Sequence, residues 1–210
     1  EHRMHFSDTS QDLGTTLRTT IGRIQGKTIT LRALMEDMGE QGLLLICAVA
    51  SLPFLIPVSI PGVSTVFGAA IILIAIAVTL NRMPWLPRKV LDREIATEKL
   101  KPALERGVNL VERINRFIRP RFQAMTEGGL VTRINGLAIA WSGLLLMAPF
   151  GFVPFSNTLP GIAVLLLALG MIQRDGLVVM AGYVMMFGTM VYFTVLVWLA
   201  FRAGQLAFGG

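Results

Sequence analysis

The sequence has few of the side chains that carry redox, metal or nucleophilic chemistry. Among its 210 residues there is one cysteine, Cys47, inside an apolar run, and there are two histidines, His2 and His5, close to the N-terminus. A single cysteine excludes an intrachain disulfide, and no zinc-ligand spacing, nucleophile elbow, Walker loop or dinucleotide-binding fingerprint occurs. The sequence therefore predicts no catalytic residue, no metal and no cofactor, and we expect that the protein is not an enzyme.

Charged residues are also scarce, and they are unevenly placed. Only 15% of the chain is charged and 53% is hydrophobic, with a mean hydropathy of +0.64, whereas soluble domains carry about 25% charged residues. Five of the 19 Lys and Arg residues precede residue 33, and twelve lie from Arg82 to Arg133. Cations that border apolar blocks are typical of membrane proteins, whose basic loops stay in the cytoplasm. We therefore predict a multi-pass membrane protein with a cytoplasmic N-terminus and cytoplasmic residues 83–133, and no nucleic-acid partner.

Two apolar blocks, residues 42–82 and 134–174, are each long enough for two helical arms and are broken by proline near the middle. One membrane crossing needs about 20 residues. The breaks contain three prolines each: Pro53, Pro57 and Pro61 in the first, and Pro149, Pro154 and Pro160 in the second. Proline removes a backbone donor and disfavours helix in the residue before it, so each block should form a helical hairpin. Such a hairpin either crosses the bilayer fully or is re-entrant, with its turn buried in protein or lining a cavity.

The two predicted hairpins also resemble each other in sequence. A displacement of 92 residues without a gap aligns Pro57 with Pro149, Ser64 with Ser156, Thr65 with Asn157 and Arg82 with Arg174. We therefore predict an internal repeat. The placement of the cations favours a parallel pair of hairpins over an inverted pair.

Amphipathic surface helices are predicted before and between the hairpins. Residues 1–41 contain one helix with Leu17 and Ile21 on its apolar face, which lies on the membrane surface or on the protein itself. A second helix there is capped by Thr30 and ended by Gly39 and Gly42. In residues 83–133, a helix that starts at Pro102 lies on the cytoplasmic leaflet or packs along the protein core.

A final transmembrane helix is predicted in residues 175–210. Residues 176–201 form a continuous apolar stretch that can span a bilayer alone. Together with the two hairpins it gives five membrane segments and places the C-terminus outside. Gly182 and Gly188 allow close helix contacts, and a homodimer is one partner arrangement that they would permit.

Hydroxyl and amide side chains follow the two proline breaks: Ser64 and Thr65 in one, and Ser156 and Asn157 in the other. If half-helices begin there, their free N–H groups and positive dipole ends would form an anion site for phosphate or a pyrophosphate-linked headgroup. The alternative is that these side chains only cap the helices and satisfy the broken backbone.

Arg82 and Arg174 end the equivalent arms of the two hairpins. A guanidinium is well suited to bidentate phosphate recognition, so both belong to the predicted binding residues. The alternative is that they extend to the cytoplasmic interface or cap helix C-termini, with Asp175 neutralising Arg174. Because the apolar arms contain no acid, any proton coupling would depend on rim carboxyls, namely Glu40, Glu127 or Asp175.

An ordered set of motifs resembles the ExoD family of bacterial exopolysaccharide-synthesis membrane proteins. The motifs are Gly42-Leu-Leu-Leu, Pro53-Phe-Leu-Ile-Pro57, Pro61-Gly62-Val-Ser64-Thr65, Arg82-Met-Pro84-Trp85-Leu-Pro87, Pro154-Phe-Ser-Asn157-Thr-Leu-Pro160 and Gln173-Arg174-Asp175-Gly176-Leu177. The set covers residues 28–200 and is specific as a whole, although each motif alone is weak. The resemblance implies a role in exopolysaccharide production or cell-envelope physiology at the bacterial inner membrane, and it implies no established reaction. The hairpins are also loosely similar, in architecture alone, to those of DedA-type proteins, which are associated with moving phospholipid or polyprenyl-phosphate headgroups.

From these features we expect an integral inner-membrane protein of exopolysaccharide synthesis that transports, or helps to handle, a lipid-linked or anionic headgroup. Its expected partner is a membrane lipid, such as a polyprenyl phosphate or another anionic lipid. The alternative is a non-catalytic structural or regulatory subunit that binds exopolysaccharide machinery or another envelope assembly through its basic helix and its glycine-bearing final span.

Overall fold

The computed structural model of this chain describes residues 13–56, 62–80, 87–114, 116–148, 153 and 155–209. Helices make up most of this part of the chain, so the predicted all-α class is confirmed. The α-helices are α1 (Leu13–Arg23), α2 (Leu31–Ser51), α3 (Val63–Leu80), α4 (Arg88–Leu91), α5 (Thr97–Ile114), α6 (Gly129–Leu146), α7 (Thr158–Gln173) and α8 (Gly176–Phe208). Two 3₁₀ helices, η1 (Leu52–Leu55) and η2 (Gln123–Met125), and two strands, β1 (Thr28–Thr30) and β2 (Glu94–Ala96), complete the described elements.

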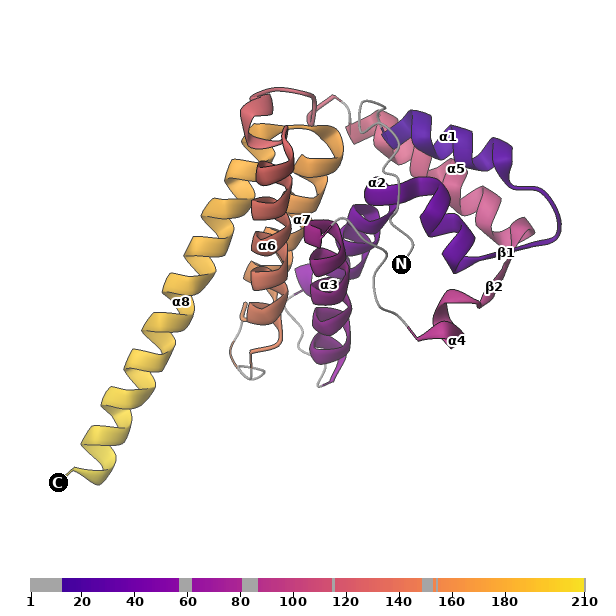
Figure 1. Ribbon diagram of the computed structural model, residues 1–210. Helices are drawn as coiled ribbons and strands as arrows, with labels where there is room; N and C mark the ends of the chain where they lie inside the picture. Colours follow the sequence, from indigo (N-terminus) through magenta and orange to yellow (C-terminus); the bar gives the residue numbers. More distant parts are fainter. Residues whose placement is uncertain are drawn as a thin grey trace.

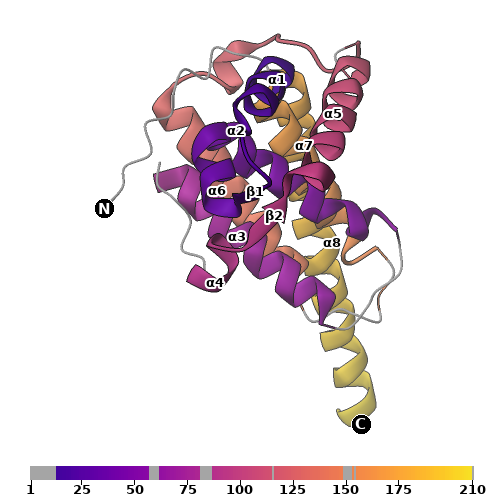
Figure 2. The same ribbon diagram turned by 90° about the vertical axis from the view of Figure 1, so that its right-hand side faces the viewer.

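The apolar helices form a bundle beside the charged elements (Figure 1). Helices α3, α6 and α7 stand together, and α8 slants away from them toward the C-terminus; Figure 2 shows the same extension of α8 from a second direction. Four helical stretches are long and apolar enough to cross a membrane, namely 31–55, 63–80, 129–146 and 176–208. The fifth predicted segment, α7, is apolar but has 16 residues, about 24 Å at 1.5 Å per residue. It is therefore shorter than a hydrocarbon core of about 30 Å.

Helix α2 connects the charged part to the bundle and bends close to the predicted position. The hydroxyl of Thr30 accepts a hydrogen bond from the N–H of Ala33 at 3.2 Å, which confirms the predicted cap. Gly39 has φ 63° and ψ −141° inside the helix, a conformation that glycine adopts readily. The prediction that Gly42 also ends the helix is wrong, because Gly42 is buried within α2 against Met38. One glycine break is enough to turn the chain from its amphipathic first turns into the apolar segment.

The amphipathic helices α1 and α5 pack against each other (Figure 1). Leu17 of α1, Ile24 just after it, and Leu104 and Val108 of α5 are all buried in the core. Of the two placements predicted for each helix, packing on the protein itself is therefore confirmed. Helix α5 begins at Thr97 and not at Pro102, because strand β2 runs directly into it and the N–H of Thr97 donates to the carbonyl of Lys27 at 3.0 Å.

Strands β1 and β2 form an antiparallel pair that the sequence did not reveal, with Ile29 opposite Ile95. Strand β1 immediately precedes α2, and β2 follows α3 and α4. The chain segments before and after the first hairpin are therefore joined at the same side of the protein. An ion pair between Arg32 and Asp92, 3.3 Å apart, links the same two segments. This arrangement agrees with the prediction that the N-terminal and central cations share one side, although the topology itself stays a prediction.

Small residues bring α3 and α6 into close contact. Gly136 of α6 lies against Thr79 of α3, and Gly143 lies against Gly68 and Ile72. A Cβ at Gly143 would be 3.0 Å from the side chain of Ile72 and 3.4 Å from the carbonyl of Gly68. Such approach of two backbones is typical of helix pairs in membranes, where small residues line the contact.

Helix α7 lies at the centre of the bundle, with Ala163, Val164, Leu167 and Ala168 fully buried. It packs on α2, α6 and α8, while α3 packs on α6. The two hairpins thus contact each other crosswise, α2 with α7 and α3 with α6, as two hairpins related by a two-fold axis would. The predicted internal repeat nevertheless stays a prediction. The close contact predicted for Gly182 is confirmed, because it lies against Leu167, whereas Gly188 faces open space.

The first proline break is confirmed in the part that the structure describes. Helix α2 ends at Ser51, Pro53 lies in the 3₁₀ helix η1, and Ile56 is extended with φ −82° and ψ 128°. At the second break, Pro160 is buried in the first turn of α7, where proline is tolerated because the early N–H groups have no helical acceptor. Four other prolines of the predicted turns lie outside the described residues: Pro57, Pro61, Pro149 and Pro154. Whether the hairpins are re-entrant therefore stays a prediction.

Candidate functional site

The two predicted breaks meet around an aromatic side chain. Phe54 of η1 is buried, and its ring packs edge-to-face on Phe67 of α3 with centroids 6.0 Å apart. On another side Phe54 lies against Gly161, in the first turns of α7. Phe54 thus joins η1 to α7, while the convergence of the polar residues of the two breaks stays a prediction.

The polar residues of the predicted anion site lie at the starts of α3 and α7. Ser64 is half-buried and Thr65 is exposed in the first turn of α3. Ser156 is buried, and Asn157 occupies the N-cap position of α7 without a capping side-chain hydrogen bond to that helix. Position at helix starts fits both the anion-site prediction and its capping alternative, and the anion site stays a prediction.

Arg174 lies at the other end of α7 from Asn157. It is the C-cap of α7 with φ 54°, and its carbonyl accepts a hydrogen bond from the N–H of Arg121 at 3.3 Å. The 16 residues of α7 separate the two ends by about 24 Å. The structure therefore does not bring Arg174 together with Ser156 and Asn157 around one headgroup. Arg82, its predicted equivalent, lies outside the described residues.

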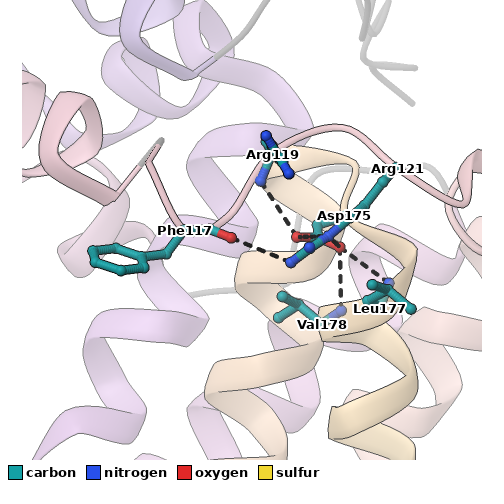
Figure 3. A network of polar contacts seen from close by, with 6 residues as sticks. All are labelled: Phe117, Arg119, Arg121, Asp175, Leu177 and Val178. Carbon is teal, nitrogen blue, oxygen red and sulfur yellow. Dashed lines mark hydrogen bonds and ion pairs between the residues drawn. The ribbon is translucent and has the colours of Figure 1, made fainter.

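A buried carboxylate, Asp175, holds together the turn between α7 and α8 (Figure 3). Arg121 Nε donates to both of its oxygens at 2.9 and 3.0 Å, and the backbone N–H of Arg119 donates to Oδ2 at 3.3 Å. Asp175 is also the N-cap of α8, because Oδ1 accepts from the N–H groups of Leu177 at 3.0 Å and Val178 at 3.4 Å. We call this cluster, Asp175 with Arg119, Arg121, Leu177 and Val178, the Asp175 anchor.

The Asp175 anchor corrects one prediction, since Asp175 does not pair with its neighbour Arg174. It pairs with Arg121, 54 positions earlier in the chain. The backbone reinforces this link: Arg121 N–H donates to the carbonyl of Arg174, and Gly176 N–H donates to the carbonyl of Arg121 at 2.8 Å. The segment after α5 is thereby fixed to the start of α8, and Arg121 is a structural residue that the sequence did not identify.

The electrostatics of the anchor keep Asp175 ionised. Burial raises the pKa of Asp175, but the hydrogen bond from Arg121 and those from the backbone of Val178 and Arg119 outweigh it, so that the pKa lies below its usual value. The same contact raises the pKa of Arg121. A carboxyl with a lowered pKa and all its partners in place does not exchange a proton near neutral pH, so among the rim acids Asp175 is a poor candidate for proton coupling.

A second buried polar group joins α6 to α8. Asn135 donates from Nδ2 to the carbonyl of Met125 at 2.9 Å, and the hydroxyl of Tyr183 donates to its Oδ1 at 2.7 Å. Asn135 is almost fully buried, and both ends of its amide are paired, as buried polar groups require. This contact holds the first half of α8 on the bundle and offers no free group to a ligand.

A cleft lies between α6 and the outer half of α8. We call it the α6/α8 groove; its volume is about 590 Å³. Helix α6 contributes Trp141 and Leu145. Helix α8 contributes Met190, Phe193, Thr194, Val197, Trp198 and Phe201. Apart from the Thr194 hydroxyl, which donates to the carbonyl of Met190 at 2.8 Å, the lining side chains are apolar or aromatic.

The groove exists because α8 is longer than its neighbours. With 33 residues, α8 reaches about 50 Å, whereas the 16 residues of α7 reach about 24 Å. In the first half of α8, Val179, Gly182 and Met186 are buried against the bundle. The same face of α8 continues through Phe193 and Val197, beyond the end of α7 at which Thr158 lies. A stripe that packs on protein in one half of the helix therefore faces the groove in the other half.

Comparison with known proteins decides the family. A family model described as "Exopolysaccharide synthesis, ExoD" matches residues 13–195. The chain belongs to the ExoD family. This ExoD-family chain is 61% identical over 202 residues to "Protein ExoD" of Rhizobium meliloti (strain 1021). The aligned residues make up 96% of this chain and 84% of that protein. The chain is 26% identical over 181 residues to an uncharacterized protein of Synechocystis sp. (strain ATCC 27184 / PCC 6803 / Kazusa), over 86% of this chain and 84% of that one. No solved structure matches it significantly.

The resemblance seen in the motifs is thereby confirmed, and the ExoD family is one of exopolysaccharide synthesis. The matched range contains the Asp175 anchor, Trp141 and Leu145, and α8 as far as Val195. The outer residues of the groove, Val197, Trp198 and Phe201, follow that range.

Proposed function

We propose that this protein acts in exopolysaccharide synthesis as a transporter or transport accessory that holds a lipid-linked intermediate or carrier lipid by its apolar chain. The observation that carries this proposal is the α6/α8 groove. Its volume of about 590 Å³ is in the range of pockets that bind small ligands, about 300–1,000 Å³. Bacterial exopolysaccharides are polar polymers, so a membrane protein that handles their precursors is expected to hold the lipid that carries them.

The lining of the groove suits a chain and not a headgroup. Phe193 and Trp198 present aromatic surface, Leu145 and Val197 present aliphatic surface, and no ionisable side chain lines the groove. Burying an apolar chain there removes apolar area from contact with other lipids and gains packing contacts, the main source of attraction within a membrane. A sugar or phosphate group would find too few polar partners inside the groove and would have to lie at its end.

A non-catalytic structural subunit is the second candidate, and one observation favours it. The outer half of α8 exposes apolar side chains on the face away from the groove as well, including Leu199 and Leu206. A contiguous apolar helix surface can be covered by a partner helix as well as by lipid. In that case a protein would occupy the surface that we assign to a lipid chain.

Native mass spectrometry of the gently solubilised protein separates the two candidates. We expect the wild type to retain an isoprenoid or other long-chain lipid, and Thr194→Trp to lose it, because an indole at position 194 fills the groove. Val195→Trp is the matched control, since Val195 is also exposed but points about 100° around the helix. Equal lipid retention by both variants, or a protein partner in place of a lipid, would overturn the proposal.

A further inference from the structure

The outer end of α8 carries an isolated charge. After Asp175 the sequence contains one charged residue, Arg202, in 35 positions, and the apolar arms 43–80 and 134–173 contain none. Arg202 follows Asp175 by 27 positions, about 40 Å along a helix. This distance exceeds a hydrocarbon core of about 30 Å. The charge of Arg202 therefore lies at the end of the bundle opposite the basic elements and the Asp175 anchor.

Arg202 is held against the rim of the α6/α8 groove. Its guanidinium lies over the ring of Trp198, 5.4 Å from the ring centroid, within the range of a cation–π contact. Trp198, the partner in this contact, and Phe201, which immediately precedes Arg202, both line the groove. The guanidinium is thus placed where the apolar lining ends.

The partner of Arg202 in this contact, Trp198, lies one turn before it in α8, the direction in which long side chains of a helix ordinarily point. Among the described residues no carboxylate lies within ion-pair distance of Arg202.

We infer that Arg202 binds the phosphate of the lipid whose apolar chain occupies the α6/α8 groove. This inference rests on the proposed function and adds to it the headgroup class and the end of the groove at which the headgroup lies. A guanidinium presents donors in a planar fork that matches phosphate oxygens. The ligand is therefore a phosphate- or pyrophosphate-headed lipid at the face of the membrane away from the basic elements.

A pair of probes with the same chain separates phosphate recognition from chain binding. Geranylgeranyl phosphate and geranylgeraniol share a 20-carbon isoprenoid chain and differ in the phosphate. Binding of each is measured with the full-length protein in zwitterionic nanodiscs. We expect the wild type to bind the phosphate at least tenfold more tightly than the alcohol. Arg202→Gln should lower the affinity for the phosphate about tenfold and leave the affinity for the alcohol unchanged.

Arg174→Gln is the matched control, because Arg174 lies at the opposite end of the bundle and was itself predicted to bind phosphate. It should keep the full preference for the phosphate. If Arg174→Gln removes the preference and Arg202→Gln keeps it, the headgroup lies at the other end and the inference is wrong. If the wild type binds both probes equally, the role of Arg202 fails while the proposed function stands. If the wild type binds neither probe, both the role of Arg202 and the proposed function are wrong.

Discussion

Asp175→Ala should lower the melting temperature of the detergent-solubilised protein by about 6–12 °C. The substitution removes the N-cap of α8, worth about 1 kcal/mol, and leaves buried donors without partners, each at about 1–3 kcal/mol. A total of about 3 kcal/mol corresponds to this shift for a chain of about 200 residues, at about 2–4 °C per kcal/mol. A thermal melt followed by circular dichroism measures it.

Asp92→Ala is the control for this substitution, because the ion pair of Asp92 with Arg32 is exposed at both side chains and such pairs contribute at most about 1 kcal/mol.

The difference in stability between wild type and Asp175→Ala should also depend on pH. Because the folded pKa of Asp175 is lowered, the contribution is complete above the ordinary aspartate pKa of about 3.9 and is lost as pH falls through the lowered value. A difference that changed between pH 6 and 8 would contradict our account of the anchor.

Thr194→Trp should reduce exopolysaccharide output to the level of a strain that lacks the protein, while the variant still inserts and accumulates. Position 194 lies inside the α6/α8 groove, and its side chain makes only a local bond to the carbonyl of Met190. The larger side chain therefore blocks the groove without disturbing packing elsewhere. The measurement is secreted polysaccharide per cell in the deletion strain complemented by each variant.

Val195→Trp adds the same bulk at the next position, outside the groove, and should restore full output. Membrane levels of both variants are compared by immunoblot, so that a loss of protein is not mistaken for a loss of function. Normal output with Thr194→Trp at equal protein level would show that the groove is not used in exopolysaccharide synthesis.

Local features of the fold could be predicted because they depend on short stretches of sequence. Proline at position 53 predicted the end of α2, Thr30 predicted a cap, and the spacing of Leu17 and Ile21 predicted an amphipathic helix. Each rests on backbone chemistry or on a periodicity that a few residues reveal. The family could likewise be identified from ordered motifs, since the resemblance and the family match agree.

Contacts between distant segments could not be predicted in the same way. Arg121 and Asp175 are 54 positions apart, and no periodicity connects them, so the sequence pointed to the adjacent Arg174 instead. Asp175 before an apolar run is a recognisable N-cap signal, but it says nothing about the partner. The β1–β2 pair was missed for a similar reason, because three-residue strands are too short for a pattern to show.

The groove and Arg202 were missed because they depend on relative helix length. The apolar stretch from residue 176 predicted a membrane helix. The sequence does not show, however, that α8 is about 25 Å longer than α7 and extends beyond it. The stripe of Met190, Phe193, Val197 and Phe201 could have been found at helical spacing. Without the length of α7, however, that stripe is no different from a face packed on protein.

The most direct test of the central claim is photo-crosslinking in living cells from a benzophenone side chain placed in the α6/α8 groove. With p-benzoylphenylalanine at position 194, we expect one dominant adduct, a phosphate-bearing lipid with a long apolar chain, identified by mass spectrometry. At position 199, which is exposed on the other face of α8, the same group should capture bulk phospholipids. If both positions yield the same bulk phospholipids in equal amounts, the groove is ordinary lipid-facing surface and the claim is wrong.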